Sequence, residues 1–121
     1  MAILAALAGG QLSFTQPSGE RQQVALVQGN IPQDLKWLAT MREETRDIYA
    51  GLTDGLPGDT LVIWPESAMI EFYQDIRGFV DSEGEAVAAK GGALISGLPW
   101  RDQSRSPVTY HNSIAVVGTE A

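Results

Sequence analysis

The stretch TLVIWPE, residues 60–66, joins a continuous apolar run to a proline and an acid. A short apolar run closed by a chain breaker is typical of a strand that is buried on both faces of a sheet. The same pattern occurs in VALV, residues 24–27, and in ALISGL, residues 93–98. A fourth strand is predicted over residues 112–117, after a polar loop at 101–107. These four runs favour a sheet at the centre of the fold.

The segments between the strands have helical periodicity. Asp34 is positioned to cap a helix that begins near Leu35. Apolar and small residues then recur at helical spacing: Leu38, Met41, Thr45, Ile48 and Leu52. A second helical region is predicted over residues 72–90, with an interruption at 82–84 because glycine is costly inside a helix. The alternation of strand and helix predicts an α/β fold with right-handed crossovers.

The composition excludes several classes of function. A length of 121 residues fits one domain, and a net charge of −7 argues against a nucleic-acid partner, which requires clustered cations. The chain has no cysteine and one histidine, so it offers no disulfide, no thiolate ligand and little for a zinc site. Asp81, Glu83 and Glu85 lack the pattern of a calcium loop and are interpreted as a solvated helix face. No metal and no cofactor is predicted.

The first residues of the chain, 1–9, begin with an unbroken apolar run. A bilayer span needs about 20 apolar residues, so this run is too short to cross a membrane by itself. Two interpretations remain: a frayed terminus without a function, or the end of a transmembrane helix whose earlier part is missing. Residues 10–23, which include Ser, Thr, Pro and Gly, are predicted to be a polar linker.

Residues that directly follow the strands are the first candidates for a site, because ligands of α/β folds bind at the carboxyl ends of the strands. They are Gln28-Gly29-Asn30, Glu66, Gly97 and Gly118. Glu66 could act as a general base at the end of its apolar strand, or it could cap the next segment or face solvent. His111 could pair with Ser113 or Ser96, but the chain has no G-x-S-x-G elbow, and the role of His111 stays open.

Three longer stretches together resemble one protein family. They are VALVQGNIPQDLKW at residues 24–37, LVIWPESA at 61–68 and GGALISGLPWRD at 91–102. In order and approximate spacing they resemble the extracytoplasmic domain of bacterial apolipoprotein N-acyltransferases, a branch of the nitrilase (carbon-nitrogen hydrolase) superfamily. The resemblance implies that residues 24–121 form the N-terminal half of a nitrilase-like α-β-β-α sandwich. It also favours a membrane-helix remnant at residues 1–9, because the family places this domain after a membrane bundle.

The resemblance also implies a chemistry. In the family, a cysteine takes an acyl chain from a phospholipid as a thioester and passes it to the diacylglyceryl-cysteine of a lipoprotein. Glu66 matches the general base of the family, and Trp37 matches a tryptophan near the lipid substrate. The alternative for Trp37 is an aromatic side chain that packs on the surface at the start of a helix. The resemblance also implies that the protein is located in the bacterial inner membrane, with this segment on the periplasmic side.

The chain departs from the family pattern because the catalytic lysine and cysteine are missing. The family places both beyond the last predicted strand, and neither Lys36 nor Lys90 matches the catalytic lysine. We therefore interpret the chain as a fragment that is inactive by itself. Two alternatives stay open: a fragment of a soluble nitrilase-type amidase, and a non-catalytic binding module with half of the fold.

Overall fold

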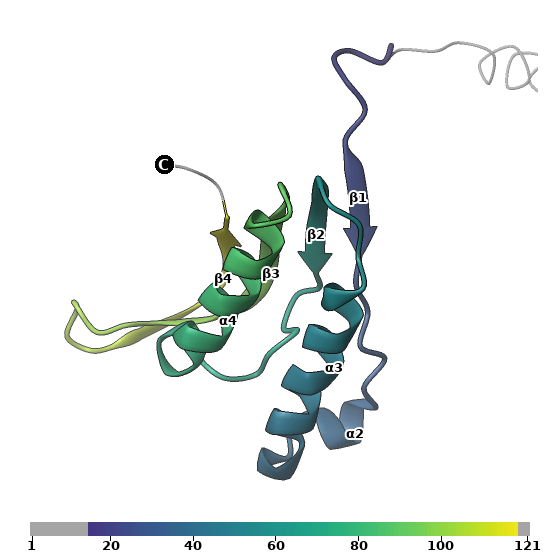
Figure 1. The fold of residues 1–121 in the computed structure, drawn as a ribbon. Helices are drawn as coiled ribbons and strands as arrows, with labels where there is room; N and C mark the ends of the chain where they lie inside the picture. Colours follow the sequence, from purple (N-terminus) through teal and green to yellow (C-terminus); the bar gives the residue numbers. More distant parts are fainter. Residues whose placement is uncertain (1–14, 119–121) are drawn as a thin grey trace, which may run out of the picture.

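The structure is a computed structural model that describes residues 15–118 (Figure 1). Its strands are β1 (Gln23–Leu26), β2 (Thr60–Trp64), β3 (Ala93–Asp102) and β4 (Thr109–Val117). Its helices are α2 (Gln33–Lys36), α3 (Arg42–Asp54) and α4 (Tyr73–Ala88), with a 3-10 turn, η1, at Ala39–Met41. Strands and helices alternate along the chain, so the predicted α/β class is confirmed.

The N-terminal predictions fall largely outside the described part of the chain. Residues 1–9, the predicted remnant of a membrane helix, lie outside it entirely. Of the predicted linker, residues 15–22 contain neither helix nor strand. Among residues 15–118, no helix has the length and apolar character needed to cross a membrane.

The four strands form one sheet in the order β1-β2-β3-β4. β1, β2 and β3 run parallel, and β4 is antiparallel to β3. Side chains on a strand alternate between the two faces of the sheet. The register therefore places a row of aliphatic side chains on one face, one from each strand: Leu26, Ile63, Ile95 and Val116.

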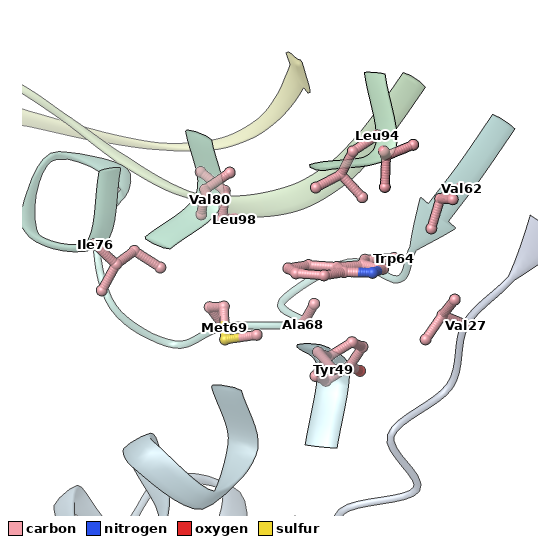
Figure 2. Close-up of a cluster of buried hydrophobic side chains, with 11 residues drawn as sticks. Val27, Tyr49, Val62, Trp64, Ala68, Met69, Ile76, Val80, Leu94 and Leu98 are labelled. Carbon is pink, nitrogen blue, oxygen red and sulfur yellow. The ribbon is translucent and has the colours of Figure 1, made fainter. Parts of the chain in front are cut away.

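The opposite face of the sheet carries the core, which α3 and α4 cover (Figure 2). Val62 and Trp64 from β2 and Leu94 and Leu98 from β3 are each at most 3% exposed. Burying a large aliphatic side chain contributes about 1.5–3 kcal/mol. This alternating pattern of buried residues fixes which face of β2 and β3 meets the helices.

Trp64 lies at the centre of this core. Its indole N–H donates to the hydroxyl of Thr53 over 3.0 Å. The ring centroids of Tyr49 and Phe79 lie 5.1 Å and 6.0 Å from that of Trp64. Trp64 is the last residue of β2, and its contacts connect this strand to α3 and α4. Pro65 and Glu66 follow it directly.

The single helix predicted from residue 35 to residue 52 is wrong in its first part. α2 ends at Lys36, and Leu38 has an extended backbone with φ −76° and ψ 132°. The side chains of residues 38–40 are exposed, so no packing compensates the cost of a continuous helix there. Pro32 occupies the N-cap position of α2, and Asp34 lies in its first turn instead of capping it.

The buried stripe of α3 also differs from the predicted one. Thr45, Tyr49 and Thr53 are buried, whereas Leu52 is 46% exposed. The inner face of α3 thus follows a spacing of four residues, one position beyond the predicted Ile48 and Leu52. The hydroxyl of Thr53 is satisfied by Trp64, which explains why a polar residue lies on the inner face.

The predicted interruption at residues 82–84 is wrong as well. α4 is continuous over Tyr73–Ala88, and Gly84 is buried within it. A Cβ atom on Gly84 would lie 2.2 Å from Cγ1 of Val117 in β4. The glycine therefore permits a close approach of helix and strand, and this packing outweighs its helix penalty of about 1 kcal/mol.

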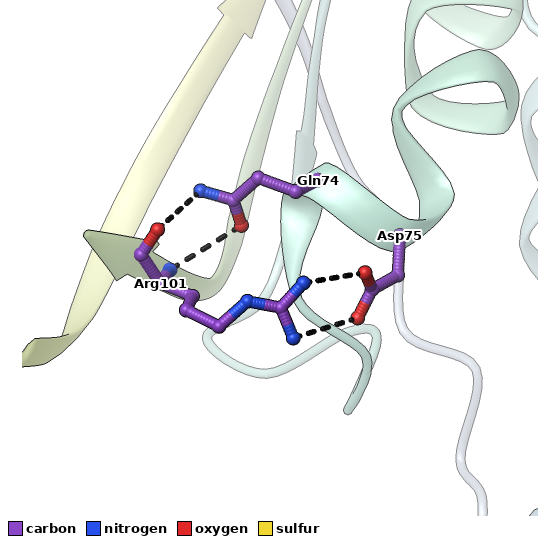
Figure 3. A network of polar contacts seen from close by, with 3 residues as sticks. All are labelled: Gln74, Asp75 and Arg101. Atoms are coloured by element: carbon purple, nitrogen blue, oxygen red, sulfur yellow. Dashed lines mark hydrogen bonds and ion pairs between the residues drawn. The ribbon is translucent and has the colours of Figure 1, made fainter. Parts of the chain in front are cut away.

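Strand β3 extends past Leu98, its predicted end, to Asp102. The start of α4 holds this extension (Figure 3). Gln74 Nε2 donates to the carbonyl of Arg101 over 2.8 Å, and the N–H of Arg101 donates back to Gln74 Oε1 over 3.3 Å. The guanidinium of Arg101 binds both carboxylate oxygens of Asp75 at 2.7 and 3.4 Å. β4 begins earlier than predicted because it pairs with this extension.

One face of the sheet has no helix over it within the described residues. Leu26 is 79% exposed, Ile114 72% and Val116 52%. Ile63 and Ile95 lie on the same face of the sheet, where Ile63 pairs with Ile95 and Ile95 pairs with Val116. We call these five residues the open face. A monomeric protein rarely leaves a continuous apolar surface of this kind in water.

Candidate active site

Glu66 lies in a tight turn directly after β2, at the carboxyl ends of the parallel strands. The N–H of Ala68 donates to the carbonyl of Pro65 over 3.1 Å and closes the turn. Ser67 has a φ of +52°, in the left-handed region that residues other than glycine rarely adopt. Such a residue costs about 1–3 kcal/mol and persists only where surrounding contacts define the backbone. The carboxylate is thus presented by a constrained turn.

Gly97 of β3 lets this turn pass close to the sheet. A Cβ atom on Gly97 would lie 2.7 Å from Cα of Glu66 and 3.1 Å from the carbonyl oxygen of Pro65. Glycine inside a strand often marks such a close approach of another backbone segment. Any larger residue at position 97 would displace Glu66, so Gly97 belongs to the site although it carries no functional group.

An open cavity of about 450 Å³ lies on one side of Glu66. Its walls come from the ends of β1 and β2, from α2 and from α3. The polar side chains in the lining are those of Gln28, Asn30, Gln33, Lys36, Tyr49 and Glu66. The cavity therefore combines a carboxylate and an ammonium group with amides and aliphatic walls, as ligand sites commonly do. Within residues 15–118, no three His, Asp or Glu side chains are grouped to hold a metal ion.

Tyr49 contributes a neutral hydroxyl to this cavity. The residue is 4% exposed, and burial raises the pKa of its hydroxyl, with an opposing hydrogen bond from the backbone of Gly29. The phenol therefore stays protonated at neutral pH. Gly29 leaves room for the ring, because a Cβ atom there would lie 2.8 Å from Cε2 of Tyr49.

The structure brings together most of the residues predicted to follow the strands. Gln28, Asn30 and Glu66 line the same cavity, and Gly97 lies against the turn of Glu66. The exception is Gly118, which lies at the opposite end of the strands. Its inclusion was wrong because β4 is antiparallel, so the carboxyl end of this strand points away from the site.

Asn112 of β4 reaches Glu66, a contact that the sequence did not predict. Its Nδ2 donates to Oε1 of Glu66 over 3.1 Å. The antiparallel register places Asn112 opposite Pro99, and no local pattern signals this long-range pairing. His111 points to the other face of the strand, where its Nε2 lies 3.1 Å from the hydroxyl of Thr109.

Trp37 is the C-cap residue of α2, directly after Lys36 of the cavity. Its side chain is 60% exposed and lies outside the cavity lining. An exposed aromatic side chain beside a cavity is available to an incoming substrate. The same exposure is compatible with the surface role that the sequence left open.

Comparison with known proteins reveals clear relatives. The chain is 34% identical over 116 residues to the apolipoprotein N-acyltransferase of Pseudomonas syringae pv. tomato, a match that covers 95% of this chain and 23% of that protein. It is 31% identical over 111 residues to the apolipoprotein N-acyltransferase of Methylococcus capsulatus, covering 91% and 22%. The chain is homologous to one segment of the apolipoprotein N-acyltransferases. The relative from Shewanella oneidensis is 32% identical over 115 residues, covering 95% and 21%.

Homology to the apolipoprotein N-acyltransferases confirms the resemblance carried by the sequence motifs. The chain spans less than a quarter of the length of these curated relatives. No protein-family model matches the chain.

Proposed function

We propose that this chain is a segment of an apolipoprotein N-acyltransferase and that Glu66 is the general base of the complete enzyme. The observation that carries the proposal is the placement of Glu66, which lies in a constrained turn at the strand ends and lines an open cavity. The name of the relatives indicates the reaction class, acyl transfer to the nitrogen of an apolipoprotein.

In this proposal, Glu66 accepts the thiol proton of a cysteine, whose thiolate attacks an ester carbonyl of a phospholipid. The acyl chain moves to sulfur as a thioester, and protonated Glu66 returns its proton to the glycerol oxygen, so that the lysophospholipid leaves as an alcohol. Glu66 then accepts a proton from the α-amine of the lipoprotein as the amine attacks the thioester, and it returns this proton to the cysteine sulfur that leaves. A lysine stabilises the charge on the tetrahedral intermediate. This chain contains no cysteine, so the nucleophile belongs to another part of the protein.

We also propose that the chain is half of a nitrilase-like sandwich on the periplasmic side of the bacterial inner membrane. The open face supports this, because a second sheet packed against it would bury its exposed aliphatic side chains. Leu26 and Ile114 are the most exposed of them. A structure of the full-length protein is expected to show both side chains buried, and finding them in water would contradict the sandwich.

Intact-mass analysis after incubation with phospholipid tests the proposed function. The full-length protein is expected to gain the mass of one acyl chain, and hydroxylamine is expected to release it as a thioester. The chain described here is expected to gain nothing, because it has no cysteine. An acyl adduct on this chain alone, or none on the full-length protein, would show the proposal to be wrong.

Trp37→Ala in the full-length protein is expected to raise the KM for phospholipid about tenfold, the typical cost of removing an aromatic contact residue. Reaction of the enzyme thiol with a small soluble alkylating reagent should change little, because Trp37 lies outside the cavity. Trp100→Ala is the matched control, since Trp100 is also partly exposed but stacks on Tyr73. Equal effects of the two substitutions would assign Trp37 a structural role.

A further inference from the structure

Asn112 and Glu66 approach each other from different strands, across 46 positions in the sequence. We infer that Asn112 is a positioning residue that holds the Glu66 carboxylate in its working orientation. The inference rests on the proposed role of Glu66 as general base. It names a residue of β4 for which neither the sequence motifs nor the names of the relatives assign a role.

The geometry shows why Glu66 needs such a partner. The turn fixes the backbone of Glu66, but the side chain has several rotatable bonds and extends into solvent. The amide of Asn112 donates to Oε1 over 3.1 Å and so restricts those rotations. Hydrogen bonds to a charged group are about twice as strong as bonds between neutral groups. With Oε1 engaged, we assign proton acceptance to the second oxygen, Oε2.

Asn112 contacts Glu66 at a second cavity, distinct from the main one. This second cavity of about 370 Å³ lies over the open face, and its lining includes Asn112, Glu66, Gly97 and Ile114. The main cavity, with Lys36, shares Ile63 and Glu66 with the second cavity but does not include Asn112. Glu66 thus lines both cavities and is held by Asn112 in the second.

The register of the β3–β4 hairpin makes this anchor possible. Gly97 pairs with Ile114, and Asn112 pairs with Pro99. The absence of a side chain at Gly97 lets Glu66 lie against β3, within reach of the next strand. Gly97 and Asn112 therefore act on the same residue, one through the backbone and the other through the carboxylate.

The test uses the full-length protein with Asn112→Asp and Asn112→Leu. We expect kcat of acyl transfer to fall about 10-fold to 100-fold in both, as for loss of a hydrogen bond to a charged group, with KM for phospholipid nearly unchanged. Aspartate has the size of asparagine and suits an exposed position, but its ionised form donates no hydrogen bond to a carboxylate. His111→Gln, on the other face of the same strand, is the control and should leave kcat unchanged.

A double variant separates positioning from a general structural effect. If Asn112 acts through Glu66, adding Asn112→Asp to Glu66→Gln should cause no further loss of rate. Multiplicative losses would overturn the inference, as would an Asn112→Asp enzyme within threefold of wild-type kcat. If Leu prevents folding, the Asp variant decides. An active Glu66→Gln enzyme would refute the proposed base itself, whereas an inactive Glu66→Gln with an unaffected Asn112→Asp would refute only the positioning role.

Discussion

Glu66→Gln in the full-length protein is expected to lower acyl transfer by a factor of about 10² to 10⁴, the usual contribution of a general base. Glutamine keeps the shape and the hydrogen-bonding capacity of the side chain but cannot accept a proton. The protein should still be produced and inserted into the membrane, because Glu66 is exposed and lies outside the core. Transfer of a labelled acyl chain from phospholipid to a lipoprotein peptide measures the loss.

Glu85→Gln is the matched control for this substitution. Glu85 is an exposed carboxylate on α4, away from the site, and its replacement should leave the rate unchanged. A capping role for Glu66 would predict a stability loss of about 1 kcal/mol with little change in rate. α4 begins at Tyr73 with Phe72 as its N-cap residue, so Glu66 does not cap this helix. Retention of more than about a tenth of the wild-type rate would contradict the assignment of a general base.

Gly84→Ala and Gly78→Ala are expected to change stability in opposite directions, although both lie in α4. At Gly78 a Cβ atom would meet nothing within 4 Å, so alanine should stabilise the helix by about 0.5–1 kcal/mol. At Gly84 the same atom would lie 2.2 Å from Cγ1 and 2.3 Å from Cβ of Val117. Overpacking of this kind typically costs about 1–3 kcal/mol.

Thermal unfolding of the two variants beside the wild-type protein measures this difference. Gly84→Ala should lower the unfolding midpoint and Gly78→Ala should raise it. The double substitution Gly84→Ala with Val117→Gly should recover part of the loss, because it removes both Cγ1 and Cβ, the atoms that clash. If Gly84→Ala raised the midpoint, α4 and β4 could not be in the close contact described.

The parts of the fold that depend on local sequence were predictable. β2 occupies Thr60–Trp64 as predicted, because a short continuous apolar run closed by a proline is typical of a buried strand. The parallel order of the first three strands follows from the alternation of strand and helix. The break at Leu38 was not predictable in this way, because whether a helix continues there depends on what its exposed face contacts.

Some residues of the candidate site were predictable from the sequence, and others were not. Glu66 was identifiable because it follows an apolar strand, and parallel strands gather their ends at one edge of the sheet. Gly118 was misplaced, since direction in the sheet is not visible in a single strand. Asn112 was missed because its contact with Glu66 depends on the register of an antiparallel pair.

The sequence by itself determined the α/β class, the residues of β2, the acid at its end and the resemblance to the N-acyltransferases, because each is carried by a contiguous stretch. Only the tertiary structure decided the role of Gly84 and Gly97 and the partner of Glu66. Both glycines look like chain breakers in the sequence, yet each is needed where a second backbone or side chain comes too close for a Cβ atom. Contacts of this kind join residues that are far apart in the chain and form only in the packed arrangement. No local sequence pattern therefore indicates them.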